Sequence, residues 1–256
     1  MGRADFQKTL GKGRVCVGRA RAAYFGPGLD LAPHRNAAVT IALGLEQPFS
    51  LRFLEESPRW RRSHAAVIPS GCMHHLRAAG PMGFIYLDPL TDDHRRLTSR
   101  ALRGAHERVR ALLLQQPAAS LDDVCVTLGI PRRIIGDARV AKVLRELEAR
   151  PEDFPNMAEA AAQAGLSPSR FRAIFQQHVG LPFRRYRLWR RMAVVASLVR
   201  DGSSLTRAAL AAGFSSSAHL SSTFHDMFGL SPSSLLALDI QIDVERRAAE
   251  GGGSAR

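Results

Sequence analysis

The 256-residue sequence carries 36 lysines and arginines against 23 aspartates and glutamates, which gives a formal net charge of +13. Hydrophobic residues make up 45% of it, a share that excludes an intrinsically disordered chain. The longest apolar run, AAVTIALGL, is too short to span a bilayer, and the N-terminal residues lack the hydrophobic stretch of a secretory signal. We therefore expect a cytoplasmic globular protein with no membrane partner.

The excess of positive charge favours a polyanionic partner, and nucleic acid is the commonest one. Charge alone leaves open the alternative of a basic surface without such a partner. Cys16, Cys72 and Cys125 form no CxxC motif and leave one thiol unpaired. We expect reduced cysteines rather than a disulfide framework.

Residues 1–90 have the pattern of a β-rich domain. Short apolar runs, among them AVTIALGL, AAVIP and GFIYLDP, are separated by glycines and prolines. From residue 91 the pattern becomes helical, and over 92–115 apolar side chains recur every three or four positions, at Leu97, Ala101, Ala105, Val109 and Leu112. This helix either packs on its own β domain or pairs with a second subunit, so we expect residues 91–136 to form a helical linker or dimerisation region.

A further helix is predicted before Pro151, with one apolar stripe at Val140, Val143, Leu144 and Leu147. The sequence then repeats itself: residues 161–182 read AAQAGLSPSRFRAIFQQHVGLP and residues 209–232 read ALAAGFSSSAHLSSTFHDMFGLSP. In each copy an Ala-rich segment ends at a glycine, Gly165 or Gly213, where the left-handed backbone that ends a helix costs glycine little. A helix, a glycine turn and a second helix make a helix-turn-helix, whose second helix lies in the major groove of DNA.

Local signals support the helix boundaries of the first copy. Ser167 is placed to cap its second helix, with Pro168 in the first turn. Asn156 and Glu159 have the spacing of a capping box for the helix before it.

The second helix of each copy has an apolar and a polar face. The inward residues are Phe171, Ile174 and Phe175 in the first copy, and Leu220, Thr223, Phe224 and Phe228 in the second. The outward residues of the first copy are Ser169, Arg172 and Gln176. A helix between the copies buries Leu188, Met192, Val195 and Val199 and carries a basic stripe suited to phosphate contacts, at Arg184, Arg187 and Arg191. One such unit could be an ordinary corner between helices, but two copies joined by an Arg-rich helix favour DNA binding.

Residues 137–236 resemble the DNA-binding domain of the AraC/XylS family of bacterial transcription regulators. The resemblance rests on DARVAKVL, AAQAGLSPSRFRAIFQQHVGLPFRRYRLWRRM and AALAAGFSSSAHLSSTFHDMFGLSP, of which the last is highly specific for the family. It implies a domain over 137–238 that places two recognition helices in successive major grooves of promoter DNA. Base contacts would then come from Ser169, Arg172, Ala173, Ser217, Ala218, His219, Ser221 and Ser222, and we add Gln176 on the same outer face as Arg172.

Arg172 is the residue that we expect to read a base directly, because a guanidinium can bridge O6 and N7 of a guanine. The second recognition surface consists almost entirely of small side chains. We expect this surface to read bases weakly and to contact mainly the DNA backbone.

Two stretches of the first ninety residues, GLDLAPHRN (28–36) and IPSGCMHHL (68–76), resemble cupin motifs. Many AraC/XylS members carry a small cupin-like barrel that binds an effector, so the effector-binding candidates here are His34, Cys72, His74 and His75. The full cupin motif has a second histidine where Asn36 stands. That departure argues against a cupin enzyme with an open iron or manganese centre. A zinc, copper or nickel site at the three histidines and Cys72 is the alternative to partly buried wall residues. Because spacing alone often misleads, we expect wall residues, with neither a metal nor another cofactor.

The prediction is an α+β chain: a cupin-like β-barrel over 1–90, the helical region 91–136, a double helix-turn-helix domain over 137–238 and a flexible tail over 239–256. We expect a transcription regulator that forms a homodimer and binds a small-molecule effector. The resemblance implies an activator, because activation is usual in the family, and an activator would contact RNA polymerase. No catalytic motif stands out, so we expect no enzyme. The alternatives are a cupin-type metal-binding protein or enzyme with a helical appendage, and an architectural DNA-binding protein without an effector.

Overall fold

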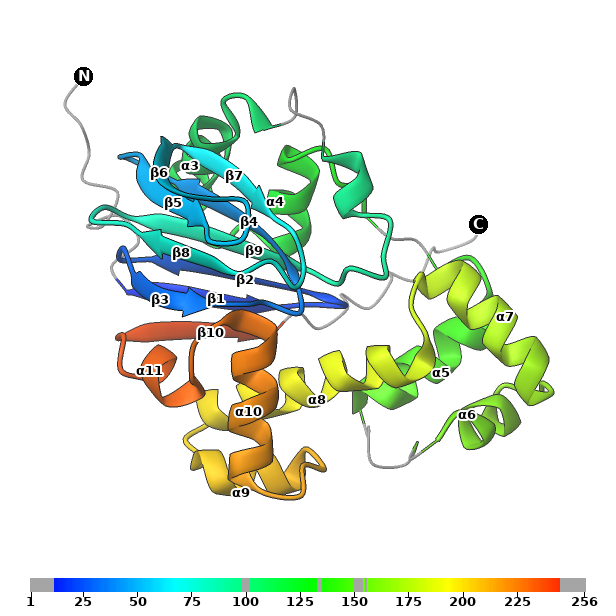
Figure 1. The fold of residues 1–256 in the computed structure, drawn as a ribbon. Helices are drawn as coiled ribbons and strands as arrows, with labels where there is room; N and C mark the ends of the chain where they lie inside the picture. The colour runs from blue at the N-terminus through cyan, green and yellow to red at the C-terminus, as the bar shows by residue number, and fades with distance from the viewer. Residues whose placement is uncertain (1–11, 98–101, 133–134, 150–153, 155, 245–256) are drawn as a thin grey trace.

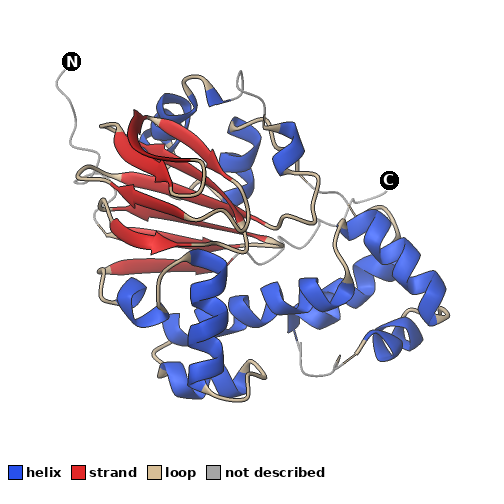
Figure 2. Cartoon of the chain, in the orientation of Figure 1, coloured by secondary structure: helices blue, strands red, loops and turns tan. Residues whose placement is uncertain are grey.

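The computed structural model describes residues 12–244 except 98–101, 133–134, 150–153 and 155 (Figure 1). A β-rich domain of two sheets is followed by a helical region, as the α+β prediction requires (Figure 2). The larger sheet has the strand order β10-β1-β2-β9-β4-β7 and the smaller one β3-β8-β5-β6. The strands are β1 (Gly13–Val17), β2 (Arg21–Gly26), β3 (Asp30–His34), β4 (Val39–Gly44), β5 (Phe49–Phe53), β6 (Ser57–Ser63), β7 (Ala65–Ile68), β8 (His74–Arg77), β9 (Met82–Leu87) and β10 (Ile240–Val244).

Strands β1, β2, β4 and β9 are buried along their whole length because both faces of the larger sheet are covered. Alternate residues point to opposite faces of a strand. One set, which includes Phe25, Ile41 and Ile85, packs under α3 (Ala105–Gln115) and α4 (Leu121–Thr127). The other set, which includes Tyr24 and Phe84, packs against the smaller sheet and the C-terminal helices.

The helices of the 91–136 region therefore belong to the β domain. Helix α3 is shorter than the predicted 92–115: it begins at Ala105, after Gly104 with a φ of +62°, and a short 3₁₀ turn, η1 (His94–Arg96), precedes it. Ala105, Val109 and Leu113 are its buried residues, so Leu113 takes the place predicted for Leu112. Ala101 lies outside the described residues. Of the two roles that the sequence left open for this apolar face, it packs on its own β domain.

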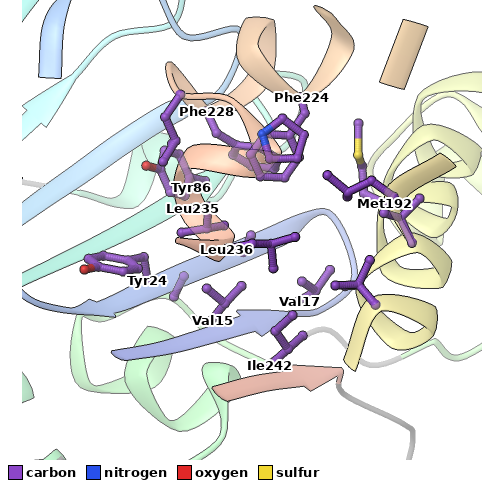
Figure 3. A pocket seen from close by; sticks show the side chains of 18 of the residues that line it. Val15, Val17, Tyr24, Tyr86, Met192, Phe224, Phe228, Leu235, Leu236 and Ile242 are labelled. Carbon is purple, nitrogen blue, oxygen red and sulfur yellow. The ribbon is translucent and has the colours of Figure 1, made fainter. Parts of the chain in front are cut away.

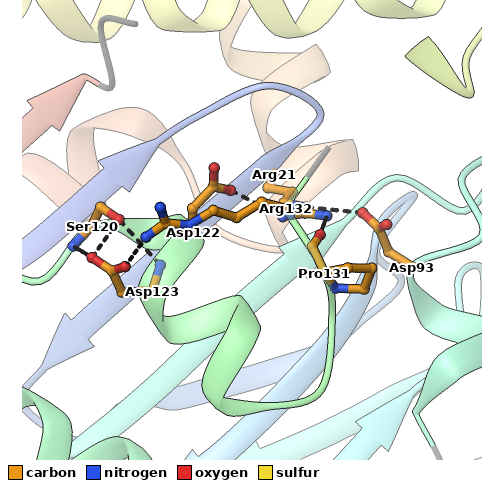
Figure 4. Close-up of polar contacts among 7 residues, drawn as sticks. All are labelled: Arg21, Asp93, Ser120, Asp122, Asp123, Pro131 and Arg132. Carbon is orange, nitrogen blue, oxygen red and sulfur yellow. Dashed lines mark hydrogen bonds and ion pairs between the residues drawn. The ribbon is translucent and has the colours of Figure 1, made fainter. Parts of the chain in front are cut away.

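A buried arginine of β2 joins residues 91–136 to the larger sheet through hydrogen bonds (Figure 4). Arg21 of β2 is 3% exposed, and its guanidinium donates to Asp93 Oδ2 at 2.9 Å, Asp122 Oδ1 at 3.0 Å and the carbonyl of Pro131 at 3.1 Å. Buried charges persist in proteins when they are paired and hydrogen-bonded in this way. At the start of α4, Ser120 and Asp123 form a reciprocal capping box.

The remaining helices are α5 (Ala138–Ala149), α6 (Met157–Gln163), α7 (Pro168–Val179), α8 (Phe183–Arg200), α9 (Leu205–Ala211), α10 (Ser217–Phe228) and α11 (Pro232–Leu236). The four residues of the predicted α5 stripe are all buried. The long helix α8 connects α6 and α7, which project away from the sheets, to α9, α10 and α11. Helix α11 and one end of α10 adjoin the larger sheet, whereas α9 lies on the side of α8 away from it (Figure 1). No helix in the described part of the chain has both the length and the apolar character to cross a membrane.

The predicted flexible tail from residue 239 is wrong for residues 240–244. These form β10, which pairs in parallel with β1 in a register from Gly13–Ile240 to Val17–Val244. Ile240, Ile242 and Val244 pack on the core, and the Arg14 guanidinium pairs with the Asp243 carboxylate. Residues 245–256 lie outside the described part. The chain thus returns to its first strand after the helical region, and the two regions share one hydrophobic core.

Candidate nucleic-acid interface

The first helix pair has the predicted caps and turn. The Asn156 side chain accepts hydrogen bonds from the backbone N–H groups of Ala158 at 2.9 Å and Glu159 at 3.1 Å. Gly165 has a φ of +63°, and Ser167 caps α7 by accepting from the Arg170 N–H, with Pro168 in the first turn. Because an L side chain strains a left-handed backbone, glycine suits the turn.

Helix α7 presents the predicted outer face to solvent. Phe171, Ile174 and Phe175 are buried, and Phe171 and Phe175 stack with ring centroids 5.4 Å apart. The opposite face carries four exposed side chains within two turns, those of Ser169, Arg172, Ala173 and Gln176. Arg172 and Gln176 share a groove with Arg184 and Arg187 of α8. One hollow thus combines a candidate base-reading side chain with two guanidiniums suited to phosphate.

The second helix pair repeats the design with smaller side chains. Ser216 caps α10 by accepting from the His219 N–H at 3.1 Å, and Gly213 has a φ of +80°. Ala218, His219 and Ser222 are exposed, whereas Ser217 and Ser221 are half-buried. The His219 ring is held by a 3.0 Å contact between its Nδ1 and Ser215 Oγ and by an edge contact with Phe214. Of the predicted inward set, Leu220 and Phe228 are buried, while Thr223 and Phe224 are half-buried.

The basic stripe on α8 divides into two roles. Arg184 is exposed, but Arg191 turns inward, where it donates to the carbonyl of Ala212 at 2.9 Å and to that of Gly213. Its guanidinium also lies 3.8 Å from the centre of the Phe214 ring. Burial lowers the pKa of both Arg187 and Arg191. The structure thus places half-buried Arg191 at the glycine turn between α9 and α10, where it positions the turn.

The two helix pairs and the helix between them carry far more positive than negative charge. Residues 156–238 contain nine arginines but only the acidic residues Glu159, Asp201 and Asp226. Asp201 pairs with Arg200, next to it in the chain. A surface so poor in carboxylates favours the approach of a phosphate backbone.

The four effector candidates lie on the smaller sheet and the loop before β8. His34, His74 and His75 are buried and Cys72 is half-buried. The His34 and His74 rings lie 4.2 Å apart, and each turns Nδ1 toward a backbone carbonyl, that of Ala32 at 2.7 Å and that of Cys72 at 3.0 Å. Burial lowers the pKa of His34 and lowers that of His74 to about 4. In the part of the chain that the structure describes, no three His, Cys, Asp or Glu side chains are grouped to hold a metal ion.

A family model described as a helix-turn-helix domain matches residues 160–237. These residues span both helix pairs and the α8 helix between them. The segment belongs to the AraC-type helix-turn-helix family. No protein of curated function matches the sequence.

Three of the solved structures similar to this chain come from two organisms. ToxT from Vibrio cholerae aligns at 13% identity and a TM-score of 0.46, over 85% of this chain and 97% of the ToxT chain. A transcriptional regulator from Chromobacterium violaceum, described as containing an AraC-type DNA-binding domain, aligns at 27% identity and a TM-score of 0.36, over 39% of this chain and 89% of its own. Another ToxT structure, containing bound unsaturated fatty acid, aligns at 11% identity and a TM-score of 0.42, over 89% and 94% of the two chains.

The second helix pair of the AraC-type domain is docked on the β domain. The Ala37 N–H donates to the carbonyl of Asp226 at 2.6 Å, and the Tyr86 ring meets Phe228 edge-on at 5.0 Å. His34 lies against Gly229, the glycine that ends α10, so closely that a Cβ there would be 2.0 Å from His34 Cδ2. The His34–His74 pair therefore borders α10.

An apolar cavity of about 80 Å³ lies between the larger sheet and the AraC-type domain (Figure 3). Its walls come from β1, β2, β9, α8, the start of α9, α10, α11 and β10, and none of its lining residues is charged. Examples are Val17, Tyr86, Met192, Phe224 and Ile242. None of the four effector candidates lines it. The sequence could not have located this cavity, because its walls come from segments more than 200 residues apart.

Proposed function

We propose that this protein is a transcription regulator that binds specific promoter DNA through α7 and α10, under the control of a small apolar effector. The observation that carries the proposal is the pair of capped helices, each following a glycine turn, on a surface rich in arginine and poor in carboxylates. The AraC-type domain assignment supports it. We infer that α7 reads bases through Arg172, while the small side chains of α10 let the DNA backbone approach closely.

Selection from a random pool of double-stranded DNA at physiological salt tests this function. Repeated rounds should enrich one sequence with two conserved segments about 10 base pairs apart, since two recognition helices enter successive major grooves. Enrichment of no sequence, together with steeply salt-dependent binding to all DNA, would support the architectural alternative.

We infer that the effector occupies the cavity beneath the AraC-type domain rather than the histidine cluster. A charged group placed there would be buried without a partner, so an uncharged apolar molecule fits best. An engineered cavity of about 150 Å³ binds benzene, and the present cavity is roughly half that size. A ligand as large as benzene must therefore widen the seam between sheet and AraC-type domain, and binding would favour a different arrangement of the two. The ToxT structures contain an unsaturated fatty acid and a naphthalenyl butenoic acid. Both are carboxylic acids, and the described residues that line the present cavity include no basic side chain to pair with a carboxylate.

Toluene and benzoate test the effector site as a matched pair, because they share a ring and differ in charge. Toluene should raise the melting temperature, as any ligand that binds only the folded state does, and benzoate should leave it unchanged. Ala196→Leu fills part of the cavity wall and should abolish the toluene effect. An equal effect of benzoate, or of toluene on the filled variant, would place the ligand elsewhere.

We propose further that the protein is a cytoplasmic homodimer that activates transcription through a contact with RNA polymerase. The apolar face of α3 is used within the chain, so a dimer contact in the 91–136 region would use other surface there, such as Val126, which is 50% exposed. Light scattering should give twice the chain mass, and transcription from the selected site should rise when the protein is added to purified polymerase. The cupin-type enzyme has less support, because His34 and His74 pack against each other and His34 lies against Gly229 at the end of α10.

A further inference from the structure

Strand β6 forms one edge of the smaller sheet, and among the residues that the structure describes it pairs only with β5. Its sequence is SPRWRRS, and Arg59, Trp60, Arg61 and Arg62 are all exposed. An edge strand offers a row of backbone N–H and C=O groups to any extended chain that comes alongside. Pro58 has no N–H to donate, so the stretch open to such a chain is that from Arg59 onward, which also carries concentrated positive charge.

Most of that charge has no partner within the protein. Among the described residues, the side chains of Arg59, Arg61 and Arg62 make no ion pair or hydrogen bond. Of the carboxylates on this sheet and its loops, Glu55 pairs with Arg35, Asp30 lies 3.4 Å from both His75 and Arg77, and Glu56 directly precedes β6. A carboxylate of a partner could therefore pair with these guanidiniums without breaking an existing ion pair.

Trp60 is 37% exposed on the outer face of this sheet. Its ring centre lies 4.6 Å from the guanidinium carbon of Arg52, 5.0 Å from that of Arg77 and 4.8 Å from the His75 ring. An aromatic ring held in place by guanidiniums presents a rigid apolar surface with little entropy left to lose on binding.

We propose that β6 is a docking strand for an extended acidic segment of a partner protein, which adds to the sheet beside β6. Trp60 and Arg62 share the outer face with Arg52 and Arg77, and Arg61, which pairs with Leu51, points to the other side. Arg59 lies where the register of β6 against β5 shifts. A partner strand with alternating carboxylate and apolar side chains would place its carboxylates at Arg59 and Arg61 and its apolar residues at Trp60. This binding mode takes affinity from the backbone and specificity from alternate side chains.

Charge and position distinguish this partner from the other occupants. A second copy of β6 would bring like charges together, which disfavours strand pairing. Strand β6 lies at the edge of the sheet opposite β3, the strand whose His34 touches α10 (Figure 1). DNA held by α7 and α10 therefore approaches a different part of the molecule, and a polypeptide is favoured.

Fluorescence anisotropy of a labelled peptide with alternating glutamate and valine tests the proposal. The full-length protein should bind it, and the double variant R59E/R61E should bind at least about tenfold more weakly. The matched control R145E/R207E changes the net charge by the same amount at exposed arginines of α5 and α9, away from β6, and should bind as the wild type does. A peptide with lysine in place of glutamate should not bind.

Two further peptides test the strand pairing itself. Methylation of alternate backbone nitrogens removes the donors that face β6, so it should abolish binding while leaving the charge intact. Trp60→Ala should also weaken binding, with an unchanged circular dichroism spectrum. Equal binding of the methylated peptide, equal loss in R145E/R207E, or tighter binding of single-stranded DNA would overturn the proposal. R59E/R61E should still bind the selected operator, which separates this proposal from the proposed function.

Discussion

The indole nitrogen of Trp189 donates a 2.7 Å hydrogen bond to Oδ2 of Asp88, a carboxylate with no exposed surface. Asp88 directly follows β9, and Trp189 lies in the middle of α8. The Arg185 guanidinium pairs with the same oxygen. The β domain thus holds the connecting helix of the AraC-type domain through one buried carboxylate.

Asp88→Ala should destabilise the protein by about 3 kcal/mol, because it leaves the Arg185 charge and the Trp189 N–H without their buried partner. Urea unfolding measures the change. Trp189→Phe removes only the indole donor and should cost less than Asp88→Ala. An Asp88→Ala protein as stable as the wild type would show that this carboxylate does not hold α8.

Gly229→Ala should loosen the contact between α10 and β3. Gly229 has a φ of +79°, and an added Cβ would lie 2.0 Å from His34 Cδ2 and 2.6 Å from Asn36 Oδ1. Gly165→Ala is the matched control, because Gly165 has a φ of +63° with open space around it and pays only the left-handed cost of about 1–2 kcal/mol. Hydrogen exchange in β3 should rise in Gly229→Ala alone. Equal exchange in both variants would contradict the docking contact.

Arg191→Ala should destabilise the domain by about 2 kcal/mol, since it removes two hydrogen bonds to the α9–α10 turn and the contact over Phe214. Arg191→Lys keeps the charge but lacks the planar guanidinium, so it should recover little of the stability that Arg191→Ala loses. The dependence of DNA affinity on salt provides the decisive measurement. The slope should stay the same in Arg191→Ala, whereas loss of a phosphate contact would reduce it by about one.

Stability should fall as the pH drops from 6.5 toward 4. Burial lowers the pKa of His74 from 6.5 to about 4, so between these values the unfolded chain binds a proton that the folded chain does not. Protonation of His74 costs the free energy of unfolding nothing above pH 6.5, and it lowers that free energy by roughly 3 kcal/mol as the pH approaches 4. Urea unfolding at pH 7.5 and pH 5 measures the loss, and His74→Gln should make it smaller. Equal stability at the two pH values would contradict a buried, neutral His74.

Arg172→Ala should cost about 1–3 kcal/mol of binding free energy at one base position and relax the preference there. Arg172 is exposed on α7 with no protein partner among the described contacts. Competition binding with single-base operator variants measures this. A uniform loss on every sequence would instead make Arg172 a phosphate contact.

The sequence predicted the features that depend on near neighbours. Gly165 and Gly213 mark their turns, and Ser167 caps its helix, because each requirement is met within a few residues. The apolar stripe of α5 is also local, and it is buried as predicted.

Features that depend on distant partners were missed. Ile240, Ile242 and Val244 alternate like a strand, but they become β10 only because β1, more than 220 residues earlier, leaves an edge open. The inward turn of Arg191 depends on Phe214 and on carbonyls of the next helix pair. The predicted role of α10 as a DNA reader gave no sign that its far end is docked on His34.

A nuclease footprint on the DNA upstream of the protein's own gene, at physiological salt with excess competitor DNA, tests the central claim most directly. Two recognition helices on one subunit should protect about two helical turns of one defined sequence. Arg172→Ala should weaken that protection at a single base step. Binding that protects no defined sequence and disappears uniformly with added salt would contradict a sequence-specific regulator.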